Sequence, residues 1–386
     1  MSYRPLFIFG LARSGTNLLA RMLDGHPQVA VGLDPLLPLF SGLRNALIAA
    51  HAPGPVRQGF SPAAPFQDYY FHPDGPALLD TILCATTADL PVAAGARANL
   101  RKRIVDRAAL ESPTLGAAMA KLDGATYSAL LAQGINIVAQ TKPGASWAGS
   151  KEVWVLEFVP LLASIFPDAR FYAVERDPRA IVASLLAMAA MDPTQAAHAP
   201  SYMRHWRKQV ALTRRFEKTP ELAGRFRAVS YELLATEPER GARELCVELG
   251  LSFSPQMLGL SAAGWLGNSS YGQQGGDVYL TSMERWRQTL PRRVVEAVDF
   301  HCGPEMALTP YRPASEPVPA GVLGYIEESG RVPGSWRSDS SDALADFGGE
   351  LVRHAMLADG GVADGPLARR CFLFADTFDA IRRAAK

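Results

Sequence analysis

The clearest indication of the fold comes from residues 6–17, Leu6-Phe7-Ile8-Phe9-Gly10-Leu11-Ala12-Arg13-Ser14-Gly15-Thr16-Asn17. Its first four residues form a continuous apolar run, which is typical of a parallel strand buried on both faces. A glycine-containing turn follows over residues 10–15, and apolar residues then recur at helical spacing from Leu18 to Leu23. The pattern predicts a strand, a turn and a helix, an arrangement in which backbone N–H groups and the positive end of the helix face an anion.

This turn differs at one decisive place from the triphosphate-binding loop G-x-x-x-x-G-K-[ST]. Thr16 stands where that loop has its lysine, and the cation comes earlier, as Arg13. Triphosphate chemistry needs the lysine on the terminal phosphates and a hydroxyl on magnesium. A sulfonate on a 5′-phosphate carries less charge, so backbone amides, hydroxyls and one cation could neutralise it. A turn that binds nothing is the alternative, because a glycine motif alone is weak evidence.

A second candidate anion site follows a later predicted strand, in Val174-Glu175-Arg176-Asp177-Pro178-Arg179-Ala180. Asp177 is a suitable N-cap for a helix whose first turn contains Pro178. Arg176 precedes that helix and Ser184 lies about two turns into it, so the two side chains could hold a second phosphate. The alternative is a capped helix with a surface salt bridge. Two such sites, each after a strand of one sheet, favour ligand binding, because open α/β sheets bind ligands at this edge.

The rest of the chain alternates between strand and helix patterns, which indicates a parallel sheet covered on both faces. We expect an α/β fold with a P-loop-like parallel β-sheet flanked by helices, a mostly helical insertion and a C-terminal helical extension. The main domain is predicted over residues 1–312, with the insertion at 35–134 as an acceptor-site cap, and a Pro-rich linker with helices over 313–386. Strands are predicted at 6–9, 28–31, 135–139, 170–174 and 226–230. Helices are predicted at 42–50, 76–85, 98–110, 114–133, 153–166, 178–191, 202–217, 237–249, 282–290, 292–302, 341–357 and 374–385.

Composition excludes several classes of protein. Of 386 residues, 48% are hydrophobic and the net charge is +1, which argues against disorder and against a protein that coats a polyanion. The four cysteines lack metal-ligand spacing, so no metal is expected. No membrane span or secretion signal is expected, which favours a cytoplasmic protein. The Ala-, Arg-, Gly- and Pro-rich composition suggests a high-GC bacterial source.

A basic amphipathic helix is predicted over residues 202–217. Its cations are Arg204, Arg207, Lys208, Arg214 and Arg215, with Trp206 among them. A nucleic-acid-binding helix is one interpretation. We favour a solvated face that also attracts an anionic donor, because the net charge is close to zero.

Taken together, these motifs resemble the sulfotransferases that use 3′-phosphoadenosine-5′-phosphosulfate, including the tyrosylprotein and carbohydrate types. Residues 12–17 resemble the family's P-R-S-G-T-T loop, and 176–184 its R-D-P-R-A…S motif. Leu23–Pro27 matches L-D-x-H-P, Phe166–Arg170 matches F-P-D-A-R/K, and Val229–Leu233 resembles V-x-Y-E-D-L. The likeness covers roughly residues 4–34 and 149–312.

The resemblance implies a role for each matching residue. The 5′-phosphosulfate would be bound by Arg13, Ser14, Gly15, Thr16 and Asn17, where Asn17 replaces the usual second threonine. The 3′-phosphate would be bound by Arg176 and Ser184. The nucleotide site would be completed by Tyr231, Asn268, Ser269, Ser270 and Arg285.

The resemblance also nominates catalytic residues. Asp34 aligns with the second glutamate of the tyrosylprotein motif G-E-E-T-R and would act as the general base; the alternative is that it caps a helix starting at Pro35. Lys151, in a K-[DET] segment that precedes the predicted helix 153–166, would stabilise the leaving group. Glu152 is an alternative base. Leu33 and Leu36 replace charged residues of the tyrosylprotein motif, which argues against a tyrosyl-peptide acceptor.

The expected activity is transfer of a sulfonyl group from 3′-phosphoadenosine-5′-phosphosulfate to a hydroxyl or amine of a small molecule or natural product, without a metal, releasing adenosine 3′,5′-bisphosphate. The alternatives are a nucleotide-dependent phosphotransferase of P-loop fold and a non-catalytic nucleotide-binding protein. No nucleic-acid or membrane partner is expected, and a homodimer stays open.

Overall fold

A computed structural model describes residues 3–191, 199–259, 282–314, 319, 343–359 and 365–384. The chain folds into two compact units, each built from three separate stretches. The first unit comprises Met1–Ala52, Thr81–Arg176 and Pro220–Leu280, and the second Pro53–Asp80, Asp177–Thr219 and Thr281–Lys386. The predicted domain boundary between residues 312 and 313 falls inside the second unit and stays a prediction.

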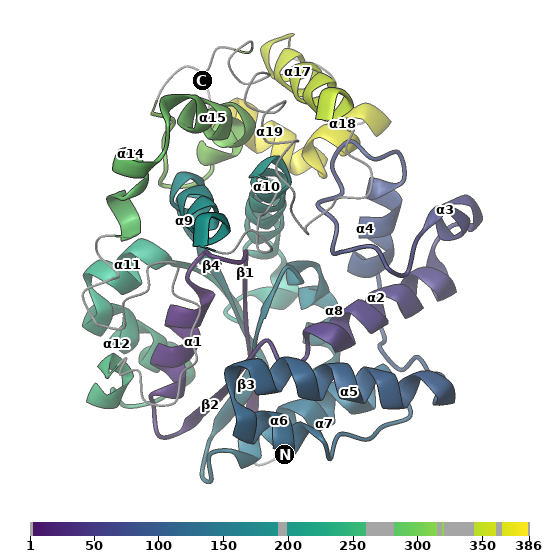
Figure 1. The fold of residues 1–386 in the computed structure, drawn as a ribbon, viewed down its shortest axis with the longest axis vertical. Helices are drawn as coiled ribbons and strands as arrows, with labels where there is room; N and C mark the ends of the chain where they lie inside the picture. Colours follow the sequence, from purple (N-terminus) through teal and green to yellow (C-terminus); the bar gives the residue numbers. More distant parts are fainter. Residues whose placement is uncertain are drawn as a thin grey trace. The chain divides into compact units, whose positions relative to one another are not determined.

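The first unit is built on a parallel sheet of five strands in the order β2-β3-β1-β4-β5. The strands are β1 (Arg4–Gly10), β2 (Val29–Leu33), β3 (Trp147–Val153), β4 (Arg170–Glu175) and β5 (Phe226–Ser230). Helices flank the sheet (Figure 1). The predicted α/β fold with a P-loop-like parallel sheet is therefore confirmed.

The central strand, β1, explains why its sequence is uniformly apolar. It pairs with β3 on one edge and β4 on the other, and Leu6 to Phe9 have no exposed surface. The Phe7 ring lies 5.7 Å from the Phe171 ring of β4 and 5.6 Å from that of Phe166. A strand buried on both faces has no solvent side on which a polar residue would be favoured.

Helices of the first unit cover both faces of its sheet. α1 (Thr16–Asp24) contacts β1, β2 and β3, while α7 (Tyr127–Gln140) and α8 (Val159–Ile165) lie on the opposite side (Figure 1). Its other helical elements are α2 (Leu37–His51), α5 (Ala94–Glu111), α6 (Pro113–Met119), η1 (Leu156–Phe158), η3 (Pro220–Leu222), α11 (Tyr231–Thr236), α12 (Pro238–Leu249) and η4 (Pro255–Leu258).

The strand predicted at residues 135–139 is wrong, because this segment lies within α7. Its β-branched run suggested a strand, but Leu130, Leu131, Gly134, Ile135 and Val138 are buried at helical spacing. The helix also has a good start, since the Thr126 side chain accepts a hydrogen bond from Ala129 N at 3.3 Å. Tertiary burial and the N-cap together outweigh the strand propensity of the isolated run.

The third strand is instead β3, which the sequence did not reveal. Its Gly149-Ser150-Lys151-Glu152 core is poor in strand-forming residues, yet all seven residues of β3 are buried between β1 and β2. Lys151 and Glu152 therefore lie in the sheet, and the predicted helix start beside Lys151 is wrong. The next helical elements are η1, from Leu156, and α8, from Val159.

Helices, and no strands, make up the regular secondary structure in the described part of the second unit. It contains α3 (Gly54–Gly59), α4 (Gly75–Leu83, in this unit up to Asp80), α9 (Pro178–Met191), α10 (Ala199–Phe216), α14 (Trp286–Thr289), α15 (Arg292–Met306), α17 (Ala343–Asp359), α18 (Pro366–Phe372) and α19 (Ala375–Ala384). The helical insertion and the C-terminal helical extension are thus confirmed.

The predicted solvated face of the basic helix, now α10, is wrong for three of its cations. Arg204, Arg207 and Lys208 are all at most 3% exposed. Arg207 Nη1 lies 2.5 Å from Glu350 Oε1 of α17, and Arg204 Nε lies 3.0 Å from Asp68 Oδ2. Buried charges need such partners to offset lost hydration. The partners come from distant segments, so the helix sequence alone could not show that its basic face is covered.

Three histidines in the second unit predict that acid destabilises it. Burial lowers the pKa of His205 to about 3 and the pKa values of His301 and His354 to about 4, so all three rings are uncharged in the folded unit at neutral pH. The unfolded chain takes up these protons near pH 6.5, so stability is complete above that pH and falls as the pH drops towards 4. Between pH 7.5 and 5, each ring should cost about 2 kcal/mol of unfolding free energy, measured by urea denaturation.

Variants separate this effect from general acid sensitivity. His301→Gln should lose about a third of the expected pH dependence, because one of the three rings no longer titrates. His51→Gln, at an exposed position of α2, should keep all of it. Equal stability of the unaltered protein at the two pH values would contradict the prediction.

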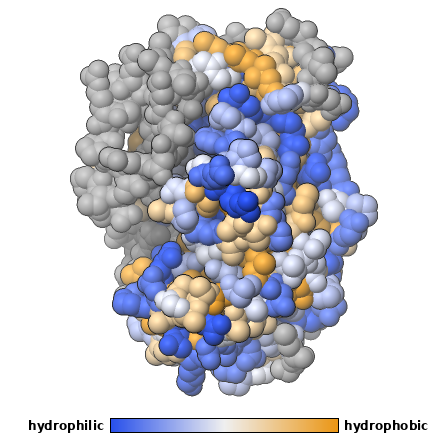
Figure 2. Space-filling view, turned by 90° about the vertical axis from the view of Figure 1, so that its right-hand side faces the viewer, coloured by the Kyte–Doolittle hydropathy of each residue, from blue (hydrophilic) through white to orange (hydrophobic). Residues whose placement is uncertain are grey.

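Within the described residues, no helix combines the length and apolar character that crossing a bilayer requires. On the face drawn in Figure 2, the coloured hydrophobic residues lie in small groups among hydrophilic ones.

Candidate functional site

The candidate site of the first unit is built around the loop between β1 and α1. Gly10 ends the strand, and Ser14 N donates to Leu11 O at 3.0 Å to close the turn. Arg13 (φ 73°) and Gly15 (φ 97°) both adopt left-handed backbone conformations. No side chain caps the N-terminus of α1, which begins at Thr16. The loop therefore presents an uncapped helix start of the kind that binds anions.

Gly15 is required here for two reasons. Its positive φ strains any residue with a side chain, and a Cβ atom at this position would lie 2.1 Å from Cδ2 of Tyr231. Tyr231, the first residue of α11 after β5, thus packs directly against the loop. The contact holds the loop and the Tyr231 ring in one fixed arrangement.

Arg176 joins the second predicted anion site to the first. It follows β4 directly, is 5% exposed, and its Nη1 donates to the carbonyl oxygen of Arg13 at 2.8 Å. Its guanidinium carbon lies 4.1 Å from the centre of the Tyr231 ring. Because β1, β4 and β5 are parallel neighbours, the residues that follow them meet at one edge of the sheet. Arg13, Gly15, Arg176 and Tyr231 are thereby brought together.

Ser14 supplies a polar group with an unused bonding capacity. It is fully buried, and its Oγ has no hydrogen-bond partner among the described residues. A buried hydroxyl without a partner is costly, so a ligand that accepts its hydrogen bond would be stabilised. Thr16 is also buried, whereas Arg13 and Asn17 are partly exposed. The residues of this loop thus fit an anionic group.

A second cluster at the same edge of the sheet surrounds Asp34. Its Oδ2 accepts from Lys151 Nζ at 2.5 Å and from Arg107 Nη2 at 2.7 Å. Its Oδ1 accepts from Val153 N at 3.2 Å, and its own N–H donates to Lys151 O at 2.7 Å. Asp34 is 3% exposed, with φ 50°. The alternative that Asp34 caps a helix is wrong, because α2 begins at Leu37 and its N-cap residue is Leu36.

Glu152 lies beside this cluster and has a different electrostatic environment. It is fully buried, and its Oε1 accepts from Leu36 N at 2.9 Å. Its Oε2 has no partner in the described part of the chain. Burial, together with the negative charge of Asp34, raises the pKa of Glu152 well above its ordinary value. Glu152 therefore holds a proton more readily than an ordinary carboxyl group, as a group that exchanges protons near neutral pH requires.

The remaining predicted residues are found elsewhere. Ser184, in α9, is buried and Arg285, the N-cap residue of α14, is half-buried; both belong to the second unit. Asn268, Ser269 and Ser270 lie outside the described residues. Their roles in nucleotide binding stay predictions.

Arg107 is a site residue that sequence reasoning missed. It lies in α5, inside the helical insertion, where Arg101, Lys102 and Arg103 precede it within two turns. Nothing in the spacing of these cations distinguishes the one that reaches Asp34. Only the packing of α5 against β2 and α2 shows it.

Comparison with known proteins supplies an independent line of argument. A family model described as "Sulfotransferase family" matches residues 5–255. Mouse carbohydrate sulfotransferase 3 is 27% identical over 193 residues, which cover 42% of this chain and 38% of that protein. Human carbohydrate sulfotransferase 6 is 30% identical over 115 residues, covering 27% of this chain and 28% of that protein. The matches thus span less than half the length of these relatives.

Solved sulfotransferase structures also align with this chain. The sulfotransferase domain of the Synechococcus PCC 7002 olefin synthase aligns with a TM-score of 0.41 and 16% identity, covering 75% of this chain and 90% of that domain. A Mycobacterium avium sulfotransferase aligns with a TM-score of 0.39 and 18% identity, covering 82% of this chain and 79% of that one.

Proposed function

The chain belongs to the sulfotransferase family, and on this premise we propose that it transfers the sulfonyl group of 3′-phosphoadenosine-5′-phosphosulfate to a hydroxyl or amine of a small molecule. The observation that carries the proposal is the contact between the loop after β1 and Arg176. That contact joins two anion-binding segments on one sheet edge, as a donor with phosphate groups at two positions of its ribose requires.

The loop after β1 is proposed to hold the 5′-phosphosulfate. The backbone N–H groups at the start of α1, the buried Ser14 hydroxyl and the side chains of Arg13, Thr16 and Asn17 are its donors. This set has no lysine of the triphosphate-binding type, which favours a donor with less terminal charge. Gly15 lets the Tyr231 ring pack against the loop backbone, because no Cβ occupies the space between them.

Arg176 is proposed to bind the 3′-phosphate. Stacking on Tyr231 and the hydrogen bond to Arg13 O orient its guanidinium, so less side-chain freedom is lost on binding. Ser184, Arg285 and the segment 268–270 are proposed to complete the nucleotide site, by their likeness to the family's motifs. When bound, the donor supplies the activated sulfonyl group.

Asp34 is proposed to act as the general base, and Lys151 is proposed to stabilise the leaving group. Asp34 accepts the proton of the acceptor's hydroxyl or amine while a new bond forms from that oxygen or nitrogen to sulfur. The bond from sulfur to the bridging phosphate oxygen breaks, and Lys151 stabilises the negative charge left on that oxygen. Arg107, which contacts the same carboxylate oxygen as Lys151, holds Asp34 in place. Glu152 is the alternative proton acceptor.

The proposal predicts sulfonyl transfer that needs no divalent metal. Purified protein given donor labelled with ³⁵S should label hydroxyl or amine acceptors, with equal rates in EDTA and in magnesium. Transfer from ATP labelled at its γ-phosphate, dependent on magnesium, would instead indicate a phosphotransferase. Tight binding of adenosine 3′,5′-bisphosphate without transfer to any acceptor in a broad metabolite extract would indicate a non-catalytic nucleotide-binding protein.

A further inference from the structure

The second unit contains a cavity of about 620 Å³. Among the described residues, its wall includes none of those proposed to bind the donor or to catalyse transfer. Most of its wall comes from residues 59–74, and α3, α4, α10, α17 and α18 supply the rest. The segment 59–74 contributes the aromatic side chains Phe60, Phe66, Tyr69, Tyr70 and Phe71. A concave, mainly apolar site of this size is typical of small-molecule binding.

The aromatic wall is held in a strained backbone conformation. Tyr69 (φ 70°) and Phe71 (φ 61°) both lie in the left-handed region, which is unfavourable for bulky residues. Such strain persists only where the surroundings enforce it, and it often occurs at ligand-binding sites. Here Phe71 N donates to Arg370 O at 3.0 Å, and Arg370 Nη2 donates to Phe71 O at 2.6 Å. The wall is therefore a preformed surface.

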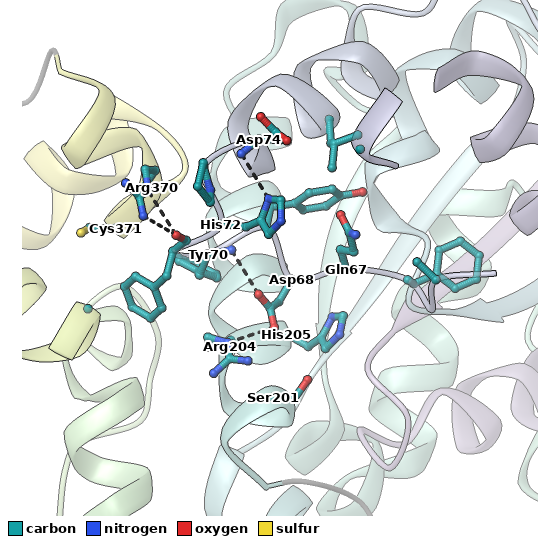
Figure 3. A pocket seen from close by; sticks show the side chains of 18 of the residues that line it. Gln67, Asp68, Tyr70, His72, Asp74, Ser201, Arg204, His205, Arg370 and Cys371 are labelled. Carbon is teal, nitrogen blue, oxygen red and sulfur yellow. Dashed lines mark hydrogen bonds and ion pairs between the residues drawn. The ribbon is translucent and has the colours of Figure 1, made fainter. Parts of the chain in front are cut away.

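The basic helix α10 fixes the other end of the same segment. Arg204 Nε donates to Asp68 Oδ2 at 3.0 Å, and Asp68 Oδ1 accepts from Tyr70 N at 3.1 Å. Lys208 Nζ donates to Gln67 O at 3.0 Å. In Figure 3, Asp68, Arg204 and His205 lie next to one another, with Gln67 and Ser201 close by.

The charged side chains that line the cavity are of both signs in equal number, namely Asp68 and Asp74 against Arg204 and Arg370. Asp68 neutralises Arg204, and both are nearly buried. Burial lowers the pKa of His205 to about 3, so this ring is uncharged at neutral pH. The Arg370 guanidinium is directed to the Phe71 carbonyl oxygen. Because the two signs cancel, a charged ligand would gain little net attraction to offset the hydration that it loses here, whereas an uncharged ligand loses less hydration.

We propose that this cavity binds an uncharged, mainly apolar small molecule that carries a hydroxyl group. The aromatic wall would cover its apolar body, and Gln67 and Ser201 offer hydrogen bonds to the hydroxyl. That such a molecule serves as the sulfonyl acceptor rests on the proposed function, whereas its binding does not.

Three probes test the ligand class by isothermal titration calorimetry at pH 7.5 with the full chain. 2-Naphthol is uncharged and apolar with one hydroxyl, 2-naphthoate has the same rings with a negative charge, and sucrose is uncharged but polar. We expect 2-naphthol to bind at least about tenfold more tightly than either of the others. Tighter binding of 2-naphthoate or sucrose, or no binding of 2-naphthol, would overturn the proposal.

A matched pair of glycine variants tests the location. Gly348 lines the cavity, and a Cβ atom there would have no neighbour within 4 Å, so Gly348→Phe adds a ring without a clash at Cβ. Gly95, in α5 of the first unit, has equally open surroundings and serves as the control. Gly348→Phe should weaken 2-naphthol binding at least about tenfold, and Gly95→Phe should not. Equal affinities in two variants with native thermal unfolding would place the ligand elsewhere and refute the proposal.

Asp68→Asn tests the charge balance separately. It leaves the Arg204 charge without its carboxylate partner, so the preference should shift towards 2-naphthoate. An unchanged ratio of the two affinities in a folded variant would contradict this argument. Binding of 2-naphthol without ³⁵S transfer to any acceptor would count against the proposed function and leave the cavity proposal intact.

Discussion

Replacing Arg176 by alanine should weaken binding of adenosine 3′,5′-bisphosphate by about 30- to 5,000-fold, equivalent to roughly 2–5 kcal/mol. The variant removes a nearly buried guanidinium that is already oriented by Tyr231 and by Arg13 O. A phosphate that had been paired with it would then be left without its charge-assisted donor. Isothermal titration calorimetry with the unaltered protein and the variant measures the difference.

Two further arginine variants separate the loss of a specific contact at Arg176 from the loss of a positive charge. Arg176→Lys keeps the charge but loses the planar fork and the stacking on Tyr231, so its affinity should lie between those of the unaltered protein and the alanine variant. Arg240→Ala, in α12 with a side chain 61% exposed, removes an equal charge from the same unit and should leave affinity unchanged. Unchanged affinity of a folded Arg176→Ala would refute the proposed 3′-phosphate site.

Asp34→Asn should slow sulfonyl transfer by about 10²–10⁴-fold while leaving affinity for adenosine 3′,5′-bisphosphate unchanged. An amide cannot take up the acceptor's proton, and it removes the negative charge that positions Lys151 and Arg107. Asparagine has nearly the same size and tolerates a positive φ, so the backbone at residue 34 (φ 50°) should be retained. Single-turnover kinetics with labelled donor separate the chemical step from product release.

Glu152→Gln is the matched variant that distinguishes the two carboxyl groups. If Asp34 is the base, Asp34→Asn should be slow, and Glu152→Gln should transfer the sulfonyl group at close to the unaltered rate. Transfer at the unaltered rate in Asp34→Asn, together with slow transfer in Glu152→Gln, would move the role of base to Glu152. The raised pKa of Glu152 and its Oε2, which has no hydrogen-bond partner among the described residues, would then explain how this carboxyl group accepts the proton.

Local signals in the sequence were reliable where one segment contained the whole pattern. The apolar run Leu6–Phe9, the glycine turn and the following helix appear as predicted, as do β4 and β5. Arg176 was also expected next to a strand end, because Asp177 and Pro178 mark the start of a helix. These features depend on neighbours within a few residues, which the sequence displays directly.

Prediction failed where long-range burial decided the outcome. Ile135–Ala139 has strand-forming residues but lies in a helix, and Lys151 lies in the interior of the sheet although its neighbours are poor strand formers. Arg107 reaches Asp34 from 73 positions along the chain. Arg207 is buried because Glu350 covers it.

From the order of residues alone, one can derive a parallel α/β sheet, a loop at its centre suited to an anion, and an arginine directly after a later strand as a second candidate for anion binding. Spacing and propensity suffice for these because each is set by contiguous residues. The pairing of Asp34 with both Lys151 and Arg107, the stacking of Arg176 on Tyr231, and the balanced charges around the aromatic cavity arise only when distant segments pack together. Electrostatic and van der Waals forces act over a few ångströms in space, regardless of separation along the chain.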